Sequence, residues 1–141
     1  MTTTGPTAVL LLAAAAIAAE GDWKAPPAEK ARTSPVASTP EALRRGKFLY
    51  QKNCQRCHGD KGKGDGPSAK TGPADPEDLT DRELQKELTD GEMFWKITKG
   101  WKDGKEVIMP AFEREIPSAE DRWKVVLFVR TLVEPSQAPA K

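Results

Sequence analysis

Apolar residues recur at helical spacing within residues 39–134, and the folded domain is therefore expected there. The first helix of this domain is predicted to begin at Pro40, because Thr39 is a suitable N-cap and proline fits the first helical position. One stripe of this helix carries the positions expected to be buried, which are Leu43, Gly46, Leu49 and Tyr50. The spacing thus predicts a helix with one face turned to the core.

Three more helices are predicted towards the C-terminus. Thr80 caps the sequence DREL, and Gly91 ends that helix. The next helix runs from about Gly91 to Lys99. Ser118 opens the capping pattern SAED of a last helix, which is apolar on two faces through Trp123, Val125, Val126, Leu127, Phe128, Val129 and Leu132. No alternating strand pattern of useful length is present, so the expected fold class is all-α.

The N-terminal part of the chain carries a separate apolar run. Residues 8–19 read AVLLLAAAAIAA, whereas a helix that crosses a bilayer needs roughly twenty apolar residues. The run closes on small residues before the first charges, which is typical of a secretory signal. We expect residues 1–19 to be a signal peptide, cleaved after Ala18 or Ala19, that exports the protein to the periplasm without lasting membrane insertion. The start MTTTGPT lacks Lys and Arg, and the alternatives are an uncleaved or misassigned start, or a hydrophobic stub on an otherwise soluble protein.

The segments that flank the domain are poor in apolar side chains. Residues 20–38 are rich in Pro, Ala, Ser and charge, with Trp23 and Val36 as the sizeable apolar groups, and are expected to be a linker. Residues 135–141 are expected to be a flexible tail. The domain between them is small, its aromatic content is 6%, and the mean hydropathy is -0.60. Domains of this size often need a staple beyond their own core.

Both cysteines and the single histidine of the chain lie in the run CQRCH, at residues 54–58. C-x-x-C-H is the attachment signature of a c-type haem. On helical turns, the two cysteines would lie on one face with roughly 5 to 6 Å between their Cβ atoms. Cys54 and Cys57 are therefore predicted to form thioethers to the haem, and His58 to bind its iron. A zinc site would need four N or S ligands, and a catalytic dithiol would need a βαβ context that the sequence lacks.

These motifs together resemble a small class I cytochrome c of the bacterial type. The resemblance extends from TPEALRRGKFLYQKNCQRCHG through GDKGKGDGP and IMPAF to SAEDRWKVVLFVRTL. It implies a cytochrome c fold of three to five helices wrapped around one covalently attached haem c, which would supply the missing core. It also implies that the first and last helices cross, with Gly46 and Tyr50 meeting Val125 and Phe128.

Met109 is the predicted sixth ligand of the iron. It lies in a predicted loop directly before Pro110, where a helix cannot continue, and it resembles the Met-Pro pair of the family. Met93 lies inside a helical pattern and is expected to fill a gap in the core. A buried loop methionine, with water or another donor on the iron, is the alternative for Met109.

The surroundings of the haem are predicted less directly. A ligating imidazole usually donates its second N–H to a carbonyl or carboxylate. In the family, a proline beyond the haem motif supplies that carbonyl, for which Pro67 is the candidate here and Pro73 the alternative. Trp95 and Trp101 are expected to pack in the core, although either could donate an indole N–H to a haem propionate.

Charge is unevenly distributed along the chain. Residues 41–72 carry eight Lys and Arg against three Asp and Glu, whereas residues 73–121 carry seven against fourteen. The basic segment could steer docking of the haem edge onto an acidic redox partner, or it could simply be solvated. The net charge is +1 and the basic residues lack interleaved aromatics, so no nucleic-acid partner is expected.

Three functions fit these observations. The first is a monohaem electron carrier with His/Met ligation, which works between a respiratory or dehydrogenase donor and a terminal acceptor. The second is a haem sensor or weak peroxidase with an open sixth site. The third keeps the redox chemistry but makes the chain a dedicated subunit of an oxidoreductase complex. A dihaem peroxidase would need a second C-x-x-C-H, so the sequence favours an electron-transfer protein over an enzyme.

Overall fold

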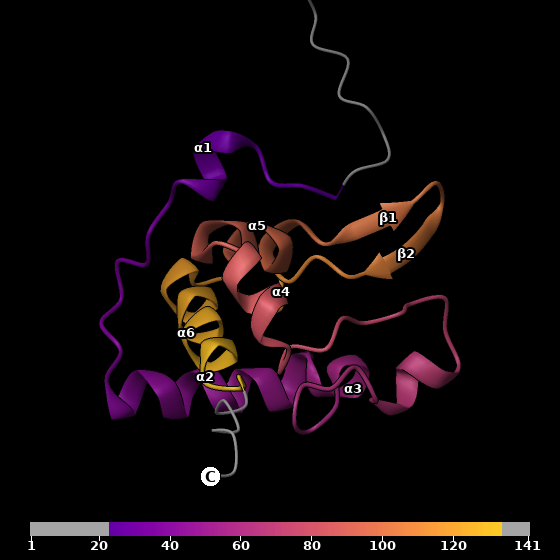
Figure 1. The fold of residues 1–141 in the computed structure, drawn as a ribbon, viewed down its shortest axis with the longest axis horizontal. Coiled ribbons are helices and arrows are strands. Elements are labelled where there is room, and N and C mark those ends of the chain that lie inside the picture. The colour runs from indigo at the N-terminus through magenta and orange to yellow at the C-terminus, as the bar shows by residue number, and fades with distance from the viewer. Residues whose placement is uncertain (1–22, 134–141) are drawn as a thin grey trace, which may run out of the picture.

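The computed structural model describes residues 23–133 (Figure 1). The expected signal peptide and tail lie outside the described residues. In chain order, the elements are α1 (Pro27–Lys30), α2 (Pro40–Asn53), α3 (Gln55–His58), a 3-10 turn (Pro67–Lys70), α4 (Arg82–Glu87), α5 (Asp90–Lys99), β1 (Trp101–Asp103), β2 (Glu106–Met109) and α6 (Ala119–Arg130). Across this part of the chain, none of the helices combines the length and the apolar character needed to cross a membrane.

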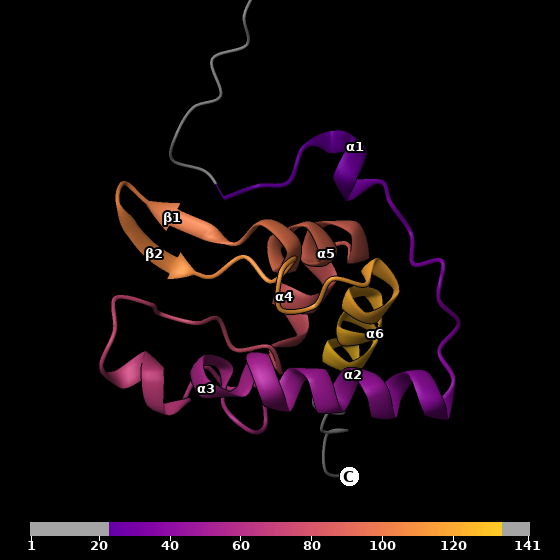
Figure 2. The ribbon, with the colours of Figure 1, turned by 180° about the vertical axis from the view of Figure 1, so that it is seen from behind.

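The predicted crossing of the first and last long helices is present. α6 lies across α2 in both views (Figures 1 and 2). The backbones approach so closely that a Cβ at Gly46 would lie 2.0 Å from the carbonyl oxygen of Lys124. One turn further along, the rings of Tyr50 and Phe128 have centroids 5.2 Å apart. The caps are also as predicted, because the side chains of Thr39 and Ser118 each accept a backbone N–H of their helix.

The core lies where α5 meets this crossed pair. Phe94 on α5 stacks on Trp123 of α6, with centroids 4.3 Å apart and ring planes 15° from parallel. The buried apolar cluster also includes residues of α2 and of the chain before α6. Its other members are Leu49, Tyr50, Cys54, Phe112 and Ile116, with Met93 and Ile97 from α5 and Val125, Val126 and Val129 from α6. α2 and α6 thus form one side of the core, and α5 packs against them on the other side.

A short antiparallel hairpin departs from the expected all-α fold. β1 and β2 pair Trp101 with Met109 and Asp103 with Glu106, and the register shifts after Trp101. Strands of three and four residues are too short for an alternating pattern to be read from sequence. Met109 therefore ends a strand and does not lie in a free loop.

The helix count and two boundaries also differ from expectation. The described residues form six α-helices where three to five were expected, because α1 and α3 are single turns of four residues. α4 ends at Glu87, because Leu88 already has extended backbone, and Gly91, which was predicted to end this helix, lies inside α5. Asp81, and not Thr80, caps α4 by accepting the Leu84 N–H at 2.9 Å. Acidic and hydroxyl residues stand side by side here, so the sequence pattern allowed either cap.

Residues 23–32, which we call the N-terminal arm, lie against α5 and differ in this from the expected loose linker. Lys30 Nζ lies 3.1 Å from a carboxylate oxygen of Glu92, which is buried. The hydroxyl of Thr89 donates to the Lys30 carbonyl at 2.8 Å. These are charge and backbone contacts, so a search for apolar stripes does not detect them.

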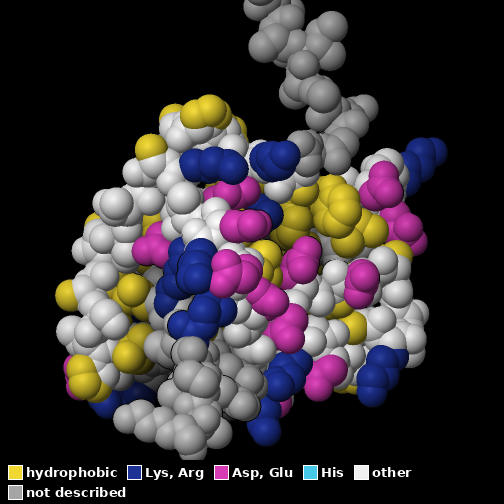
Figure 3. All heavy atoms as spheres, viewed as in Figure 1, with side chains coloured by type: hydrophobic (Ala, Val, Ile, Leu, Met, Phe, Trp, Pro, Cys, Tyr) yellow, Lys and Arg dark blue, Asp and Glu magenta, His cyan; other side chains and the backbone are white. Residues whose placement is uncertain are grey.

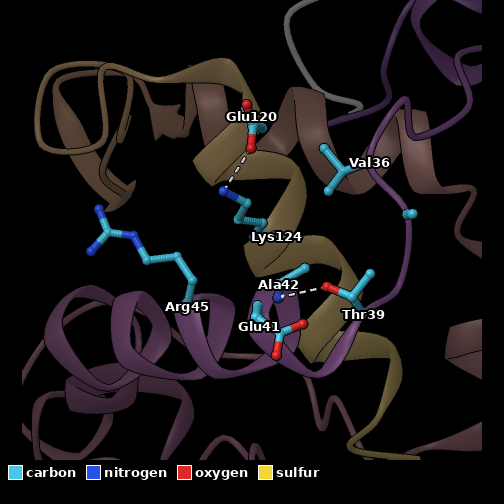
Figure 4. A pocket seen from close by; sticks show the side chains of 8 residues that line it. Val36, Thr39, Glu41, Ala42, Arg45, Glu120 and Lys124 are labelled. Carbon is cyan, nitrogen blue, oxygen red and sulfur yellow. Dashed lines mark hydrogen bonds and ion pairs between the residues drawn. The ribbon is translucent and has the colours of Figure 1, made fainter.

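Charged side chains of α2 and α6 line a hollow of the surface (Figure 4). Lys124 Nζ lies 2.7 Å from Glu120 Oε1. Arg45 Nη2 donates to Asp121 Oδ2 at 2.6 Å across the two helices. The hydrogen bond from Arg45 holds the pKa of Asp121 below its ordinary value. None of the predicted haem-binding residues lines this hollow.

Replacing Gly46 with alanine should destabilise the protein by about 1 to 3 kcal/mol, because the added methyl group meets backbone of α6 that cannot rotate away. Urea unfolding followed by circular dichroism measures the change. Lys47→Ala is the control, because the neighbouring side chain is exposed and its loss should change stability by less than about 0.5 kcal/mol. An equally stable Gly46→Ala protein would show that α6 can shift away from α2.

Stability should fall at acid pH in a way that depends on Arg45. Asp121 has a lower pKa in the folded state than in the unfolded state, so its ionised form stabilises the fold at pH values above the unfolded-state pKa. This stabilisation is lost as the pH falls through the folded-state pKa. Arg45→Gln should therefore lose less stability than the wild type between about pH 5 and pH 3. Unfolding midpoints across this range test the point, with Arg44→Gln as control because the Arg44–Glu41 pair is largely exposed. Parallel curves for Arg45→Gln and wild type would contradict it.

Candidate functional site

The CQRCH run forms one compact turn at the end of α2. The N–H groups of Cys57 and His58 both donate to the Cys54 carbonyl, at 3.1 and 3.0 Å. Cys54 is buried and Cys57 is partly buried, and both are free thiols. Burial raises the pKa of the Cys54 thiol to about 12. The two sulfur atoms and the imidazole are thus presented by a single local structure.

The glycine-rich loop folds back on this turn. The Gly64 N–H donates to the His58 carbonyl at 2.9 Å, and the Gly66 N–H donates to the Cys57 carbonyl at 3.0 Å. From the other side, the buried hydroxyl of Tyr50 donates to the Gly59 carbonyl at 2.7 Å. Burial raises the pKa of Tyr50, which keeps this donor protonated. The backbone around His58 is therefore fixed from both sides.

His58 has the features of a metal ligand. Its Nδ1 atom is buried and has no hydrogen-bond partner among the described residues. Burial lowers the pKa of the imidazole. An interaction with the backbone of Glu77 raises this pKa, but its effect is smaller. A neutral imidazole keeps the lone pair that a metal needs. Pro67 begins the 3-10 turn, and its carbonyl contact with His58 stays a prediction.

Cys54, His58 and Met109 line one apolar cavity, although they come from the junction between α2 and α3, from α3 and from β2. Most of the remaining wall comes from α4, α5 and α6. The other lining residues are Trp23, Tyr50, Glu77, Leu79, Leu84, Leu88, Met93, Lys96, Ile97, Val125 and Val129. Cys57 and Pro67 are not part of this lining. Both methionines within the described residues face the cavity, so Met93 is placed beside the site as well as in the core.

The donor set fits a covalently bound haem. Imidazole and thioether are both iron ligands, and two thiols at C-x-x-C spacing are what thioether attachment requires. An apolar cavity with an unpartnered imidazole nitrogen suits a large apolar metal complex. Among residues 23–133, no three His, Cys, Asp or Glu side chains gather to hold a metal ion by themselves.

Trp23 and Lys96 belong to the cavity wall and were not predicted from the sequence. The indole N–H of Trp23 donates to the Gly100 carbonyl at 2.9 Å, and its ring stacks on Trp101 with centroids 5.4 Å apart. Lys96 Nζ lies 4.4 Å from the centroid of the Trp23 ring. Burial is the main cause that lowers the pKa of Lys96. Within the polar segment 20–38, the large apolar side chain of Trp23 was the only feature of the sequence that indicated a position in this wall.

Comparison with known proteins places this site in a family. A profile of the family described as "Cytochrome C oxidase, cbb3-type, subunit III" matches residues 41–129. The chain belongs to this family of c-type cytochromes. The match includes the CQRCH run and ends within α6, so this cytochrome carries the family pattern through most of its described fold. A search of curated proteins found no match.

Two solved structures are similar to this cytochrome. One is a chain of the "Kuenenia stuttgartiensis reducing HAO-like protein complex Kustc0457/Kustc0458", with 28% sequence identity and a TM-score of 0.58 over 71% of this chain and 47% of that one. The other is the "KustC0563 c-type cytochrome", with 25% identity and a TM-score of 0.53 over 63% of this chain and 98% of that one. The cytochrome thus spans about half the length of the first and nearly all of the second.

Removing the Tyr50 hydroxyl should loosen the CQRCH turn. Tyr50→Phe leaves the Gly59 carbonyl without its buried donor, and we expect a loss of about 1 to 2 kcal/mol in the free energy of unfolding. Phe48→Leu is the control on the same helix, because Phe48 is 53% exposed. Equal stabilities of Tyr50→Phe and wild type in urea would show that this hydrogen bond contributes nothing.

Proposed function

We propose that this cytochrome binds one haem c, joined to Cys54 and Cys57 through two thioethers, with His58 and Met109 as the axial ligands. The observation that carries the proposal is that Cys54, His58 and Met109 face a single apolar cavity, where His58 Nδ1 lacks a partner. When bound, the group supplies a one-electron Fe(III)/Fe(II) couple, and a thioether ligand raises its reduction potential.

We further propose that the protein is a one-electron carrier and not an enzyme. Two protein ligands would occupy both axial positions and leave none for a substrate. The apolar walls from α4, α5 and α6 would surround the haem with a low dielectric, which limits solvent reorganisation during electron transfer. Membership of the c-type cytochromes supports this role.

Partners and location follow as proposals from the same role. Residues 1–19 would direct export to the periplasm, where the carrier would meet a donor and an acceptor. The basic segment 41–72 would provide a docking surface at the haem edge. On the face seen in Figure 3, acidic and basic side chains are interspersed over α4 and α6. We therefore expect a basic docking patch, if the protein has one, on another face of the molecule.

A dedicated subunit of a redox complex is the second candidate. It has the same chemistry, and two observations favour it. The matching family is described as a subunit of an oxidase, and one similar chain belongs to a multi-protein complex. Native mass spectrometry of the protein isolated from its own cells separates a free carrier from a bound subunit.

Methionine ligation is tested by a matched pair of variants, Met109→Leu and Met93→Leu. Both side chains line the cavity, and leucine conserves volume without a sulfur ligand. With haem attached, Met109→Leu should lose the ferric methionine-to-iron charge-transfer band, bind carbon monoxide in the ferrous state and show a lower reduction potential. Met93→Leu should retain the wild-type spectrum.

The outcomes separate the competing functions. A wild-type protein that binds carbon monoxide rapidly and lacks the band would favour a sensor or weak peroxidase. Loss of the band in Met93→Leu alone would assign the ligand to Met93. A purified mature protein whose mass shows no added tetrapyrrole would contradict haem attachment altogether.

A further inference from the structure

The N-terminal arm is attached to α5 at several points between its two ends. Beyond the contacts of Lys30 described above, the guanidinium carbon of Arg32 lies 4.6 Å from the centroid of the Phe94 ring. Ala25, near the start of the arm, is only 4% exposed. α1, at the centre of the arm, packs against α5. The arm is thus part of the folded domain, and its first residue, Trp23, has a defined position.

Trp23 lies where the arm reaches the cavity. Its ring lines the cavity together with Met109 and Lys96. Besides the contact with Lys96, two contacts of Trp23 go to the junction between α5 and β1. The indole N–H binds the Gly100 carbonyl, and the ring stacks on Trp101 at an interplanar angle of 14°.

The same junction supports the backbone of the predicted sixth ligand. A Cβ at Gly100 would lie 2.4 Å from the Met109 carbonyl oxygen and 2.5 Å from the carbonyl carbon of Pro110. Trp101 is the strand partner of Met109. Trp23 therefore contacts the two residues that pack directly against Met109 and Pro110. Trp23 would therefore act on the Met109 thioether through the backbone of Gly100 and Trp101.

We propose that Trp23 is a positioning residue for Met109: by holding Gly100 and Trp101 in place, the N-terminal arm keeps the Met109 thioether directed into the cavity and on the iron. This inference rests on the proposed function, in which Met109 is an axial ligand. It gives residues 23–32 a role in setting the lifetime of that ligand. The arm acts on the ligand without touching the iron.

The test compares Trp23→Ala and Trp23→Phe with Trp95→Ala in the full chain with haem attached. Trp95 lies on α5 and is partly buried, but it does not line the cavity, so its variant controls for the loss of a tryptophan near the site. We expect Trp23→Ala to weaken the ferric methionine-to-iron band and to raise the carbon monoxide association rate by about ten-fold. Trp23→Phe retains a ring for stacking and lacks the N–H, and should be intermediate.

Each result decides the point. Unchanged bands and carbon monoxide rates in both Trp23 variants, beside a wild type that shows the band, would overturn the positioning role and leave Met109 ligation intact. An equal effect of Trp95→Ala would also overturn it, because the effect would then be a general loosening. If Trp23→Ala does not accumulate with haem, Trp23→Phe decides by the same criteria. A wild type without the band would refute Met109 ligation and this inference together.

Discussion

The burial of one neutral imidazole beside an apolar cavity is the constraint on which the rest of this structure depends. Burial lowers the pKa of this imidazole and holds it as a neutral base, at a cost unless a ligand takes its lone pair. The fold fixes the backbone around His58 through the glycine-rich loop and through Tyr50. Haem binding would convert this cost into stability, because a metal that binds only the folded state stabilises that state.

The crossing of α2 and α6 gives this arrangement its rigidity. α2 ends at the haem motif, and α6 contributes Val125 and Val129 to the wall of the cavity. The close contact at Gly46 sets the distance between the two helices. α5 contributes further residues to the cavity wall and is followed by the hairpin, which ends at Met109. Elements far apart in the sequence are thereby brought around one cavity, which is what a single flat cofactor with ligands on two faces would require.

The parts of this fold that were predictable from sequence are local. The haem motif lies within five residues, and the caps at Thr39 and Ser118 are recognised from three or four positions. The hairpin was missed because its strands are too short to show a period. The arm was missed for a different reason, since Trp23 and its acceptor Gly100 are 77 positions apart and neither belongs to an apolar stripe. Long-range polar contacts leave no pattern within a single sequence window.

The place of Trp23 in the chain has a practical consequence. Only a few residues separate it from the expected cleavage point of the signal peptide, yet it forms part of the wall against which the cofactor would lie. Trimming by a peptidase, or an affinity tag fused directly to this end, would therefore alter the cytochrome's interior and not merely its periphery. Heterologous production of this protein should preserve the natural sequence from the expected cleavage point onward and carry any purification tag at the opposite terminus.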